Sequence, residues 1–170
     1  MAGIWKDIPA AVIGSTVYSD GALAARNCTV TLPEVTPTTV EVPAGGTIEL
    51  PITGMTDAME ATVTLGAPDD GFRSLCQMQS HEVEVRSALD VMGIDGTKRQ
   101  VGLKAFMTAY AKTIPGISLE LASASENELT LGVVRYQLFW DGEEVLLIDQ
   151  LNNIFKVGGT DYAKDLAALL

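Results

Sequence analysis

Residue types that carry catalysis or bind metals are scarce in this sequence. It contains one histidine, His81, and two cysteines, Cys28 and Cys76, which lie far apart along the chain. A structural zinc site has four ligands, mostly Cys and His at short characteristic spacings, and these three isolated residues do not provide them. The sequence also lacks a phosphate-binding glycine loop, a dinucleotide-binding glycine motif and a nucleophile-elbow serine. We therefore expect no catalytic site, no metal and no cofactor, and a surface or capping role for His81.

Basic residues are also few. The 11 Lys and Arg residues stand against 22 Asp and Glu residues, so the formal net charge is −11 at pH 7. Because Lys and Arg are what bind nucleic-acid phosphates, tight nucleic-acid binding is not expected. Two cysteines are too few for a disulfide framework and predict free thiols in a reducing compartment. No apolar run is long enough to span a membrane, and the N-terminus lacks a basic segment followed by an apolar one, so no signal peptide is expected.

What the sequence does contain is alternating apolar and polar residues separated by turn signals. Alternation with a period of two predicts half-buried strands, and roughly eight to ten such segments can be counted. A chain of 170 residues can form one domain with a sufficient core, so residues 1–170 are treated as a single domain. The predicted fold is mainly β: an antiparallel β-barrel or two packed sheets, with one internal α-helix, a long extended arm and a short C-terminal helix.

The clearest strand pair is Glu128–Asp149, which has Asp141-Gly142 near its centre. An Asp-Gly turn between alternating segments is the strongest local signal of a β-hairpin, because both central positions of a type I′ turn need φ > 0. With that turn fixed, Leu138 would face Val145. The second face of this hairpin is also partly apolar, so it should need a cover from a helix or from another subunit. The residues predicted to share the core face are Val134, Tyr136, Leu138, Trp140, Val145 and Leu147.

Four prolines interrupt the segment between residues 33 and 51, in which Thr38–Val42 and Thr47–Leu50 alternate on either side of Ala44-Gly45-Gly46. Proline cannot donate a hydrogen bond to a β-ladder, so this segment cannot be a central strand. We predict an extended, proline-rich arm at residues 33–51 that leaves the body, with an ordinary surface loop as the alternative. A compact domain seldom carries so long an irregular connection without a use for it.

The remaining segments are assigned by the same patterns. The N-terminal stretch shows no clear pattern beyond the anchor Trp5. Helical spacing of apolar residues after Asp69-Asp70 predicts a helix at 68–79, which should cover the remaining face of the hairpin. A second short helix should follow Gly158-Gly159, with Thr160 as its N-cap. The other predicted strands are 15–18, 22–25, 28–32, 60–65, 81–92, 100–112, 117–121 and 153–157.

Three parts of the sequence together resemble a known family. They are VYSDG at Val17–Gly21 followed by VTLPEVTPTTVEV at Val30–Val42, then IELPITGMTDAMEATV at Ile48–Val63, and NELTLGVVRYQLFWDGEEVLLIDQLNNIFKVGGTDY at Asn127–Tyr162. In order and spacing they are similar to the major tail tube protein family of contractile-tailed bacteriophages and related prophage and bacteriocin particles. The region from Pro68 to Ile117 carries weaker matches.

The resemblance implies a structural subunit and not an enzyme. Hexameric rings would stack into a hollow tube inside a contractile sheath, with strands of each subunit in a β-barrel around the lumen. DNA would pass through this lumen during ejection without specific binding. The implied partners are other copies of the chain, the tail sheath protein, and the baseplate and tail terminator proteins. The implied location is the virion tail, assembled in the host bacterial cytoplasm and without membrane contact. A headless bacteriocin or a type VI-like injection machine could use a similar subunit.

A monomeric β-sandwich that binds carbohydrate or peptide is the alternative from another class. Such a module would expose aromatic side chains on a rigid face. Aromatic residues make up only 6% of this sequence, and Trp140 falls on the predicted core face of the hairpin. The sequence therefore favours assembly over ligand binding.

Under the tube interpretation, the acidic balance would let a lumen repel DNA, so that the DNA slides. Carboxylates on the polar faces of clean strands are candidates to line it; the alternative is that they face solvent or pair with Lys or Arg. The candidate lumen-facing residues are Glu60, Glu82 and Glu84. The candidate inter-subunit residues are Thr38, Thr39, Val40, Glu41, Val42, Thr47, Ile48, Glu49 and Leu50 in the arm, and Phe139, Leu146 and Ile148 on the hairpin.

Overall fold

The computed structural model describes residues 7–66 and 68–169, so the predicted anchor Trp5 lies outside the described residues. The described chain is mainly β, with two short helices, which confirms the predicted fold class. The strands are β1 (Asp7–Ser19), β2 (Ala22–Arg26), β3 (Thr29–Thr31), β4 (Pro37–Pro43), β5 (Thr47–Thr56), β6 (Met59–Leu65), β7 (His81–Gly93), β8 (Lys98–Ala111), β9 (Asn127–Trp140), β10 (Glu143–Asp149), β11 (Ile154–Val157) and β12 (Thr160–Asp161). The helices are α1 (Asp70–Leu75) and α2 (Lys164–Leu169).

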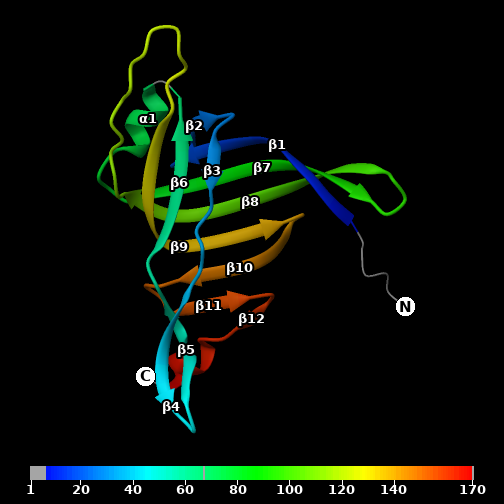
Figure 1. The fold of residues 1–170 in the computed structure, drawn as a ribbon, viewed down its shortest axis with the longest axis vertical. Coiled ribbons are helices and arrows are strands. Elements are labelled where there is room, and N and C mark those ends of the chain that lie inside the picture. Colours follow the sequence, from blue (N-terminus) through cyan, green and yellow to red (C-terminus); the bar gives the residue numbers. More distant parts are fainter. Residues whose placement is uncertain (1–6, 67, 170) are drawn as a thin grey trace.

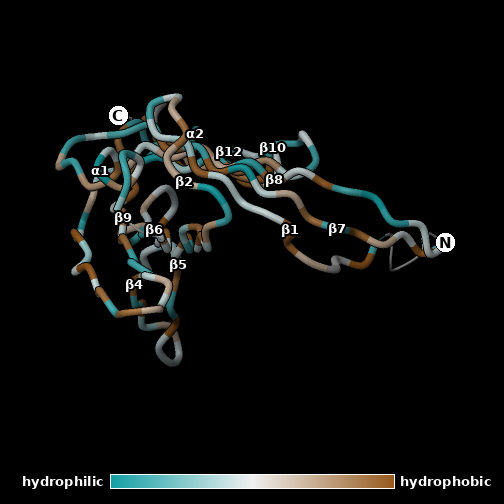
Figure 2. Tube along the Cα trace, turned by 90° about the horizontal axis from the view of Figure 1, so that it is seen from above, coloured by the Kyte–Doolittle hydropathy of each residue, from teal (hydrophilic) through white to brown (hydrophobic). Residues whose placement is uncertain are grey.

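Ten of these strands form one antiparallel sheet, whose main order is β12-β11-β10-β9-β8-β7-β1-β2. One edge of the long strand β9 pairs with β8, while its other edge pairs first with β6 and then with β10. β3 adds to the outer edge of β6. β3 and β6 cross over β7 and β8, so the two layers form an open, barrel-like body (Figures 1 and 2). β4 and β5 form a separate two-stranded sheet, the predicted arm.

The hairpin turn at Asp141-Gly142 is confirmed. Asp141 has φ = +50° and Gly142 has φ = +83°, the two positive values that a type I′ turn needs. The β1–β2 turn at Asp20-Gly21, also marked by a turn signal, has the matching values of +50° and +81°. Short turn motifs therefore predicted the hairpins correctly, because the backbone conformation they require is local.

The register beyond the Asp141-Gly142 turn differs from the simple expectation. A β-bulge just before Leu146 adds one residue to β10, so Leu138 pairs with Leu146 and not with Val145. One extra residue moves every later side chain of a strand to the opposite face. Leu146 therefore packs against the core and Ile148 is only 1% exposed, whereas Val145 is exposed. The predicted core positions of Val145 and Leu147 are wrong for this reason.

One apolar core lies between the crossing layers of the body. The predicted alternation in β6, β7 and β8 is confirmed, because Val63, Val85 and Met107 are buried while their neighbours point outward. The largest fully buried side chains are Met59, Leu75, Met107, Leu129, Leu131, Ile148, His81, Val17, Val63, Val83, Val85 and Val101. This core is complete within one subunit and holds the strands that carry the surfaces described below.

Both helices are shorter than their sequence patterns indicated. Asp69-Asp70 lie at the start of α1, as predicted, and the Asp69 carboxylate caps the helix by accepting a 2.9 Å hydrogen bond from the Phe72 N–H. However, α1 packs against β2 and β1, so the expected cover over the β9–β10 hairpin is wrong. Thr160 lies in β12 and does not cap α2; the Asp161 carboxylate accepts a 3.0 Å hydrogen bond from the Ala163 N–H instead. Neither described helix has the length and apolarity that a membrane crossing requires.

Two further segments differ from expectation in opposite directions. The stretch before Ser15 shows no clear alternation, yet β1 begins at Asp7 and pairs along β7 as far as Gly93. The alternating segment 117–121 was expected to be a strand, but it lies in a 15-residue loop, residues 112–126, with no strand in it. We call this segment the β8–β9 loop. Pairing with a neighbouring strand, and not the local pattern alone, decided both outcomes.

Candidate assembly surfaces

The arm presents two unlike faces. In its register, Val40 lies opposite Leu50 and Glu41 lies opposite Glu49. Because side chains alternate across a strand, one face of the arm is apolar and the other is acidic. No Lys or Arg occurs between residues 27 and 72, so no nearby base in sequence neutralises the two glutamates. The apolar face, formed by Val40, Val42, Ile48 and Leu50, is largely exposed, which leaves it available for a contact.

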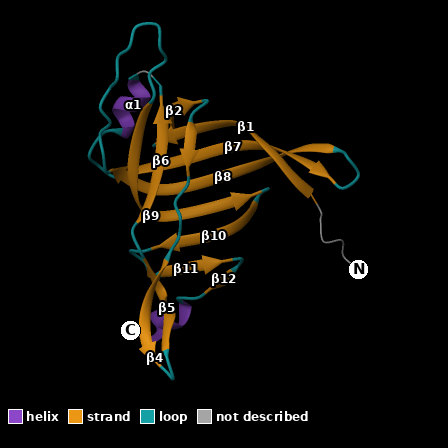
Figure 3. Cartoon of the chain, viewed as in Figure 1, coloured by secondary structure: helices purple, strands orange, loops and turns teal. Residues whose placement is uncertain are grey.

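The base of the arm is fixed to the C-terminal part of the body. The side-chain amide of Gln150 donates hydrogen bonds to the Thr56 hydroxyl at 2.9 Å and to the Asp57 carbonyl at 3.2 Å. Gly54 lies against α2, and a Cβ added there would be 3.2 Å from the Cβ of Ala163. Gly54 also has φ = +77°, a conformation that suits glycine. The arm is thus held at its base while its tip extends beyond the body (Figure 3).

Glu82 and Glu84 lie on the polar face of β7, opposite the buried side chains of Val83 and Val85. Glu82 accepts a 2.9 Å hydrogen bond from the Thr108 hydroxyl on β8. Glu84 forms a 2.6 Å ion pair with Arg86, whose guanidinium lies 4.6 Å from the centre of the Tyr18 ring. These two candidate lumen residues are therefore brought together, and each has a partner on the same face of its own subunit.

The same face of the sheet also carries bases. Lys104 lies directly opposite Arg86, and Lys156 forms a 2.7 Å ion pair with Glu144. Hydrogen bonds from Lys156 and from the Gln137 amide lower the pKa of the Glu144 carboxyl below its ordinary value. The face that holds Glu82 and Glu84 is therefore mixed in charge and not uniformly acidic.

Glu60 lies apart from the other two candidates. It stands on β6, where its neighbours Ala61 and Val63 point into the core that β6 shares with β7 and β8. The polar sides of β6 and β7 consequently point away from each other. Glu60 pairs with Lys112, the first residue of the β8–β9 loop. Glu60 therefore does not share a surface with Glu82 and Glu84, although the alternating pattern grouped the three residues.

The hairpin candidates also separate. Ile148 is in the subunit core, so it has no surface left for a neighbour. Leu146 packs against that core as well. Phe139 is half-buried on the outer face, in an edge-to-face contact with Phe106 at 5.8 Å between ring centres. Of these three residues, only Phe139 remains a candidate for an inter-subunit contact. The bulge in β10 turns Leu146 and Ile148 toward the core, and the alternating pattern gives no sign of that bulge.

The two ends of the large sheet offer pairing surfaces that the sequence did not indicate. From Asp7 to Gly14, β1 pairs with β7 on one edge and with no other described strand on the other. At the opposite end, β12 pairs with only Lys156 and Val157 of β11. The outer half of β1 with the adjoining ends of β7 and β8 forms a wing that projects from the body (Figures 1 and 2). Ile8, Val12, Ile13 and Ile94 on this wing are exposed.

One arginine ties the wing to the hairpin turn. Arg99 on β8 donates to the Asp7 carboxylate at 2.7 Å and to the Asp141 carboxylate at 3.0 Å. These hydrogen bonds raise the pKa of the Arg99 guanidinium. Bridging a carboxylate on β1 and one in the β9–β10 turn should keep the wing in register with the body, although each pair is partly exposed and individually weak.

His81 is buried, so a surface role is wrong, whereas its contact with the Gln77 carbonyl just after α1 agrees with the capping role given as the alternative. Its side chain is only 2% exposed, with Nδ1 at 2.7 Å from an Asp20 carboxylate oxygen and Nε2 at 3.3 Å from the Gln77 carbonyl. The hydrogen bond with His81 lowers the pKa of Asp20. No group of three or more potential metal-ligating side chains occurs in the described ranges. Cys28 and Cys76 are free, and burial raises the pKa of both thiols.

An apolar core, a detached arm, a projecting wing and two unpaired sheet edges are the features of a structural subunit with surfaces left for other chains. The family described as "Phage tail tube protein FII" matches residues 9–170. The chain therefore belongs to the phage tail tube family and is a structural tube subunit of a particle tail. No curated protein sequence gives a significant match.

Solved structures with a similar fold come from contractile injection systems. The chain is similar to one in the PVC sheath/tube terminator in its extended state, with a TM-score of 0.52 and 15% identity over 78% of this chain and 97% of that one. It is also similar to one in the anti-feeding prophage tube-terminating cap, with a TM-score of 0.50 and 14% identity over 74% of this chain and 87% of that one. At these identities the likeness concerns the fold alone.

Proposed function

We propose that six copies of this chain form a ring, and that such rings stack into the inner tube of a contractile tail. The observation that carries the proposal is the pair of unlike free edges at the two ends of one sheet. Pairing unlike edges is a heterologous contact, and such a contact forms a ring when its rotation closes and an open filament when it does not. The number six comes from the family resemblance. The subunit would act as a structural element and not as an enzyme.

Within a ring, the free edge of β1 would meet the β11–β12 edge of the neighbouring copy. An exposed strand edge presents unpaired N–H and C=O groups that favour strand addition. The exposed side chains of Ile8, Val12 and Ile13 would become buried on the same contact. This arrangement would give a continuous sheet around the ring and would explain why one subunit leaves apolar wing residues in water.

The face of Glu82 and Glu84 is our candidate for the lumen lining. Its ion pairs are internal to one subunit, so this face would be complete without a neighbour. A surface with both charges would offer neither a strongly basic site for DNA nor a purely acidic wall. We propose that DNA passes over it during ejection without specific binding. Glu60, on the opposite layer, would face a neighbour or solvent.

The proposed partners follow from this place in the particle. The outer surface of the tube would contact the tail sheath protein, and its two ends would meet the baseplate and the tail terminator. The subunit would be made and assembled in the bacterial host cytoplasm and would become part of the virion tail. A headless bacteriocin or injection particle would use the same ring contacts with a different cargo, so DNA in purified particles separates these cases.

Light scattering on chromatographic fractions, with negative-stain microscopy of the same fractions, tests the assembly. Wild-type protein should give rings or hollow tubes. Val12→Lys should shift the mass toward monomer, because a charged side chain on an edge strand opposes strand addition. Met78→Lys, at an exposed site outside these surfaces, is the matched control and should assemble normally. A monomer that binds a carbohydrate or peptide array would contradict the proposal.

A further inference from the structure

The turn at the end of the wing, between β7 and β8, is firmly built yet exposes an isoleucine. The Gly93 N–H donates to the Thr97 carbonyl at 2.8 Å, and the Gly96 N–H donates to the Gly93 carbonyl at 2.9 Å. The Asp95 carboxylate accepts hydrogen bonds from the Thr97 hydroxyl at 2.6 Å and from the Thr97 N–H at 3.1 Å. Ile94 lies among these bonded residues and is 75% exposed. The turn therefore holds a large apolar side chain in water at a defined position.

Two neighbouring side chains extend this surface. Met92 at the end of β7 lies opposite Lys98 at the start of β8, and both are exposed. Within the described ranges, no carboxylate lies at ion-pair distance from the Lys98 ammonium group. We call Met92, Ile94 and Lys98 the wing tip. It combines exposed apolar side chains with a positive charge that no acid of its own subunit neutralises, in a chain with few bases.

A groove of complementary character lies on α1. Its lining residues all lie between positions 68 and 77, so it opens on the side of α1 that faces away from β1 and β2. Phe72 and Cys76, one helical turn apart, are half-buried and give the groove an apolar floor. Asp70 lies at the rim with its side chain 97% exposed and only a 3.6 Å ion pair with the exposed Arg73. We call this surface the α1 groove.

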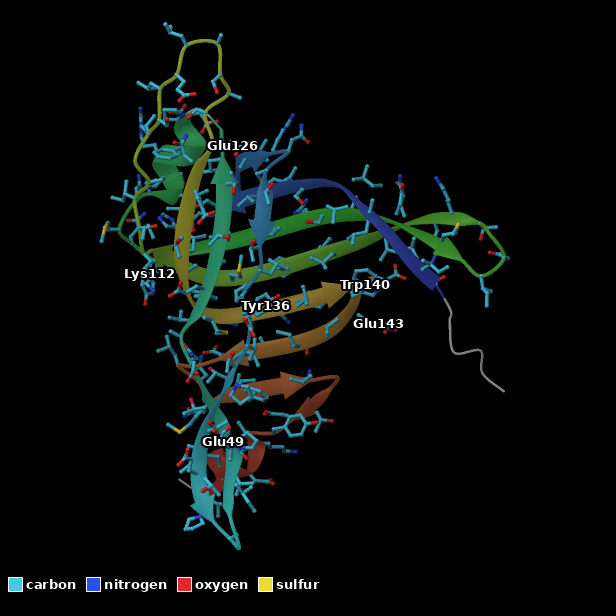
Figure 4. All side chains as sticks on the ribbon, viewed as in Figure 1. Glu49, Lys112, Glu126, Tyr136, Trp140 and Glu143 are labelled. Carbon is cyan, nitrogen blue, oxygen red and sulfur yellow. The ribbon has the colours of Figure 1, made fainter. Side chains whose placement is uncertain are left out.

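The wing tip and the α1 groove lie at the two ends of the long strands. Figures 1 and 2, which are views at right angles, both show α1 beyond one end of β7 and β8 and the wing beyond the other. In Figure 4, Lys112 marks the strand ends near α1, and Trp140 marks those near the wing. Glu126 and Glu49 mark a different direction, along which the strands follow one another across the sheet. The wing therefore projects along the strands and across the strand order.

These directions separate the two kinds of contact that a tube needs. In the proposed ring, unlike sheet edges meet, so neighbouring copies follow one another along the strand order. The face of Glu82 and Glu84 is proposed to line the lumen, so the line that joins the two layers of the body is radial. The strands then run along the tube axis, apart from the tilt that a closed barrel requires. A copy in the next ring is displaced along the strands, which brings its α1 groove toward the wing tip.

We infer that the wing tip of one copy docks in the α1 groove of a copy in the next ring. Ile94 would lie on Phe72 and Cys76, and Lys98 would approach the carboxylate of Asp70. The net charge of −11 makes most contacts between two copies repulsive, whereas this one brings a base to an acid. The inference rests on the proposed tube function and its ring contact, which together set the tube axis.

Cross-linking to the native Cys76 tests the geometry. In a Cys28→Ala background, Ile94→Cys should give ladders of linked copies when tubes are treated with a short bismaleimide. The same variant with Cys76→Ala added should give none. Gln100→Cys, on the same wing but away from its tip, should give few links to Cys76. Linked pairs that persist without Cys76 would join two wing tips and would overturn the contact, as would the absence of ladders when Cys76 is present.

Substitution at the wing tip gives an independent test. Ile94→Asp should leave ring formation intact and should raise the protein concentration needed for tube growth by about tenfold or more. It removes the burial of an isoleucine and places a carboxylate near Asp70. Gln100→Glu adds the same charge at an exposed site of the wing outside the tip and is the matched control. Met78 does not line the α1 groove, so Met78→Lys remains a control for both contacts. Rings and tubes are counted by negative-stain microscopy.

The outcomes separate the two proposals. Rings without tubes from Ile94→Asp, beside normal tubes from Gln100→Glu, would support the contact between wing tip and α1 groove. Wild-type-like tubes from Ile94→Asp would overturn that contact and leave the tube function in place. Loss of rings from the same variant would assign the wing tip to the ring contact instead. A wild-type protein that forms neither rings nor tubes would overturn the tube function and the contact that depends on it.

Discussion

Strand β6 and the β8–β9 loop both alternate apolar and polar residues, but only β6 forms a strand and buries its apolar side chains. In β6, which pairs with β3 on one side and β9 on the other, Val63 and Leu65 alternate with threonines and are buried in the core. In the loop, Leu119 and Leu121 alternate with polar residues and are exposed. The difference is the presence of a neighbouring strand on either side of β6. Alternation makes a segment able to form a strand, but a partner decides whether it does.

The largest expected loss of stability comes from a substitution in the core next to β6. Leu129 on β9 lies opposite Val63 and is fully buried, so Leu129→Ala should lower the free energy of unfolding by about 2–5 kcal/mol. Urea denaturation followed by circular dichroism measures the change. A loss below the level of a surface substitution would mean that β6 and β9 do not form the core described here.

The arm is an intermediate case, because its strands pair only with each other and its base is tied to the body. Gln150→Ala removes the hydrogen bonds to Thr56 and Asp57 and should cost about 1 kcal/mol. The loss should appear mainly as faster hydrogen exchange of the arm, with little change in the barrel strands. Uniformly faster exchange throughout the chain would contradict a locally held arm.

A smaller effect is expected at the β1–β2 turn, where Asp20 connects to His81. Since the folded-state pKa of Asp20 is lowered, its ionised form adds stability above the unfolded carboxyl pKa, and this contribution is lost as the pH falls through the folded value. The melting temperature of the wild type should therefore fall more steeply between pH 7 and acid pH than the melting temperature of Asp20→Asn. Partial exposure of the carboxylate keeps the effect small.

The smallest change in the stability of an isolated subunit is expected from a substitution in the β8–β9 loop. Leu119→Ala should change the free energy of unfolding by no more than about 0.5 kcal/mol, because the side chain is already in water. Paired with Leu129→Ala under the same conditions, it compares two leucines that differ only in burial. A large loss from Leu119→Ala would place this leucine in the fold of a single subunit.

Much of the fold was predictable because its signals are local. The Asp141-Gly142 turn, the prolines of the arm and the alternation of β6, β7 and β8 each act through neighbouring residues, and each appears as expected. The bulge before Leu146 has no such signature, so the pattern gave Val145 a core position that Leu146 takes. Strand β1 was missed because its outer half is held by pairing with β7 and not by its own pattern.

The candidate surfaces were predictable only in part, for a related reason. The arm was recognised because prolines exclude it from a central strand. Glu82 and Glu84 were placed on one polar face, but alternation cannot tell which layer a strand joins, so Glu60 was grouped with them although it lies on another layer. Basic residues of the same face, such as Lys104 and Lys156, come from distant parts of the sequence and become neighbours only through strand order.

The unlike ends of the subunit have a consequence for a whole tube. A contact between two unlike surfaces leaves one surface of each kind free at the two ends of any stack. The stack therefore has a direction, and each added copy recreates the surface that the previous copy used. Because every addition is identical, the contacts between copies do not limit the number of copies. The length of the tube would therefore have to be set by another molecule.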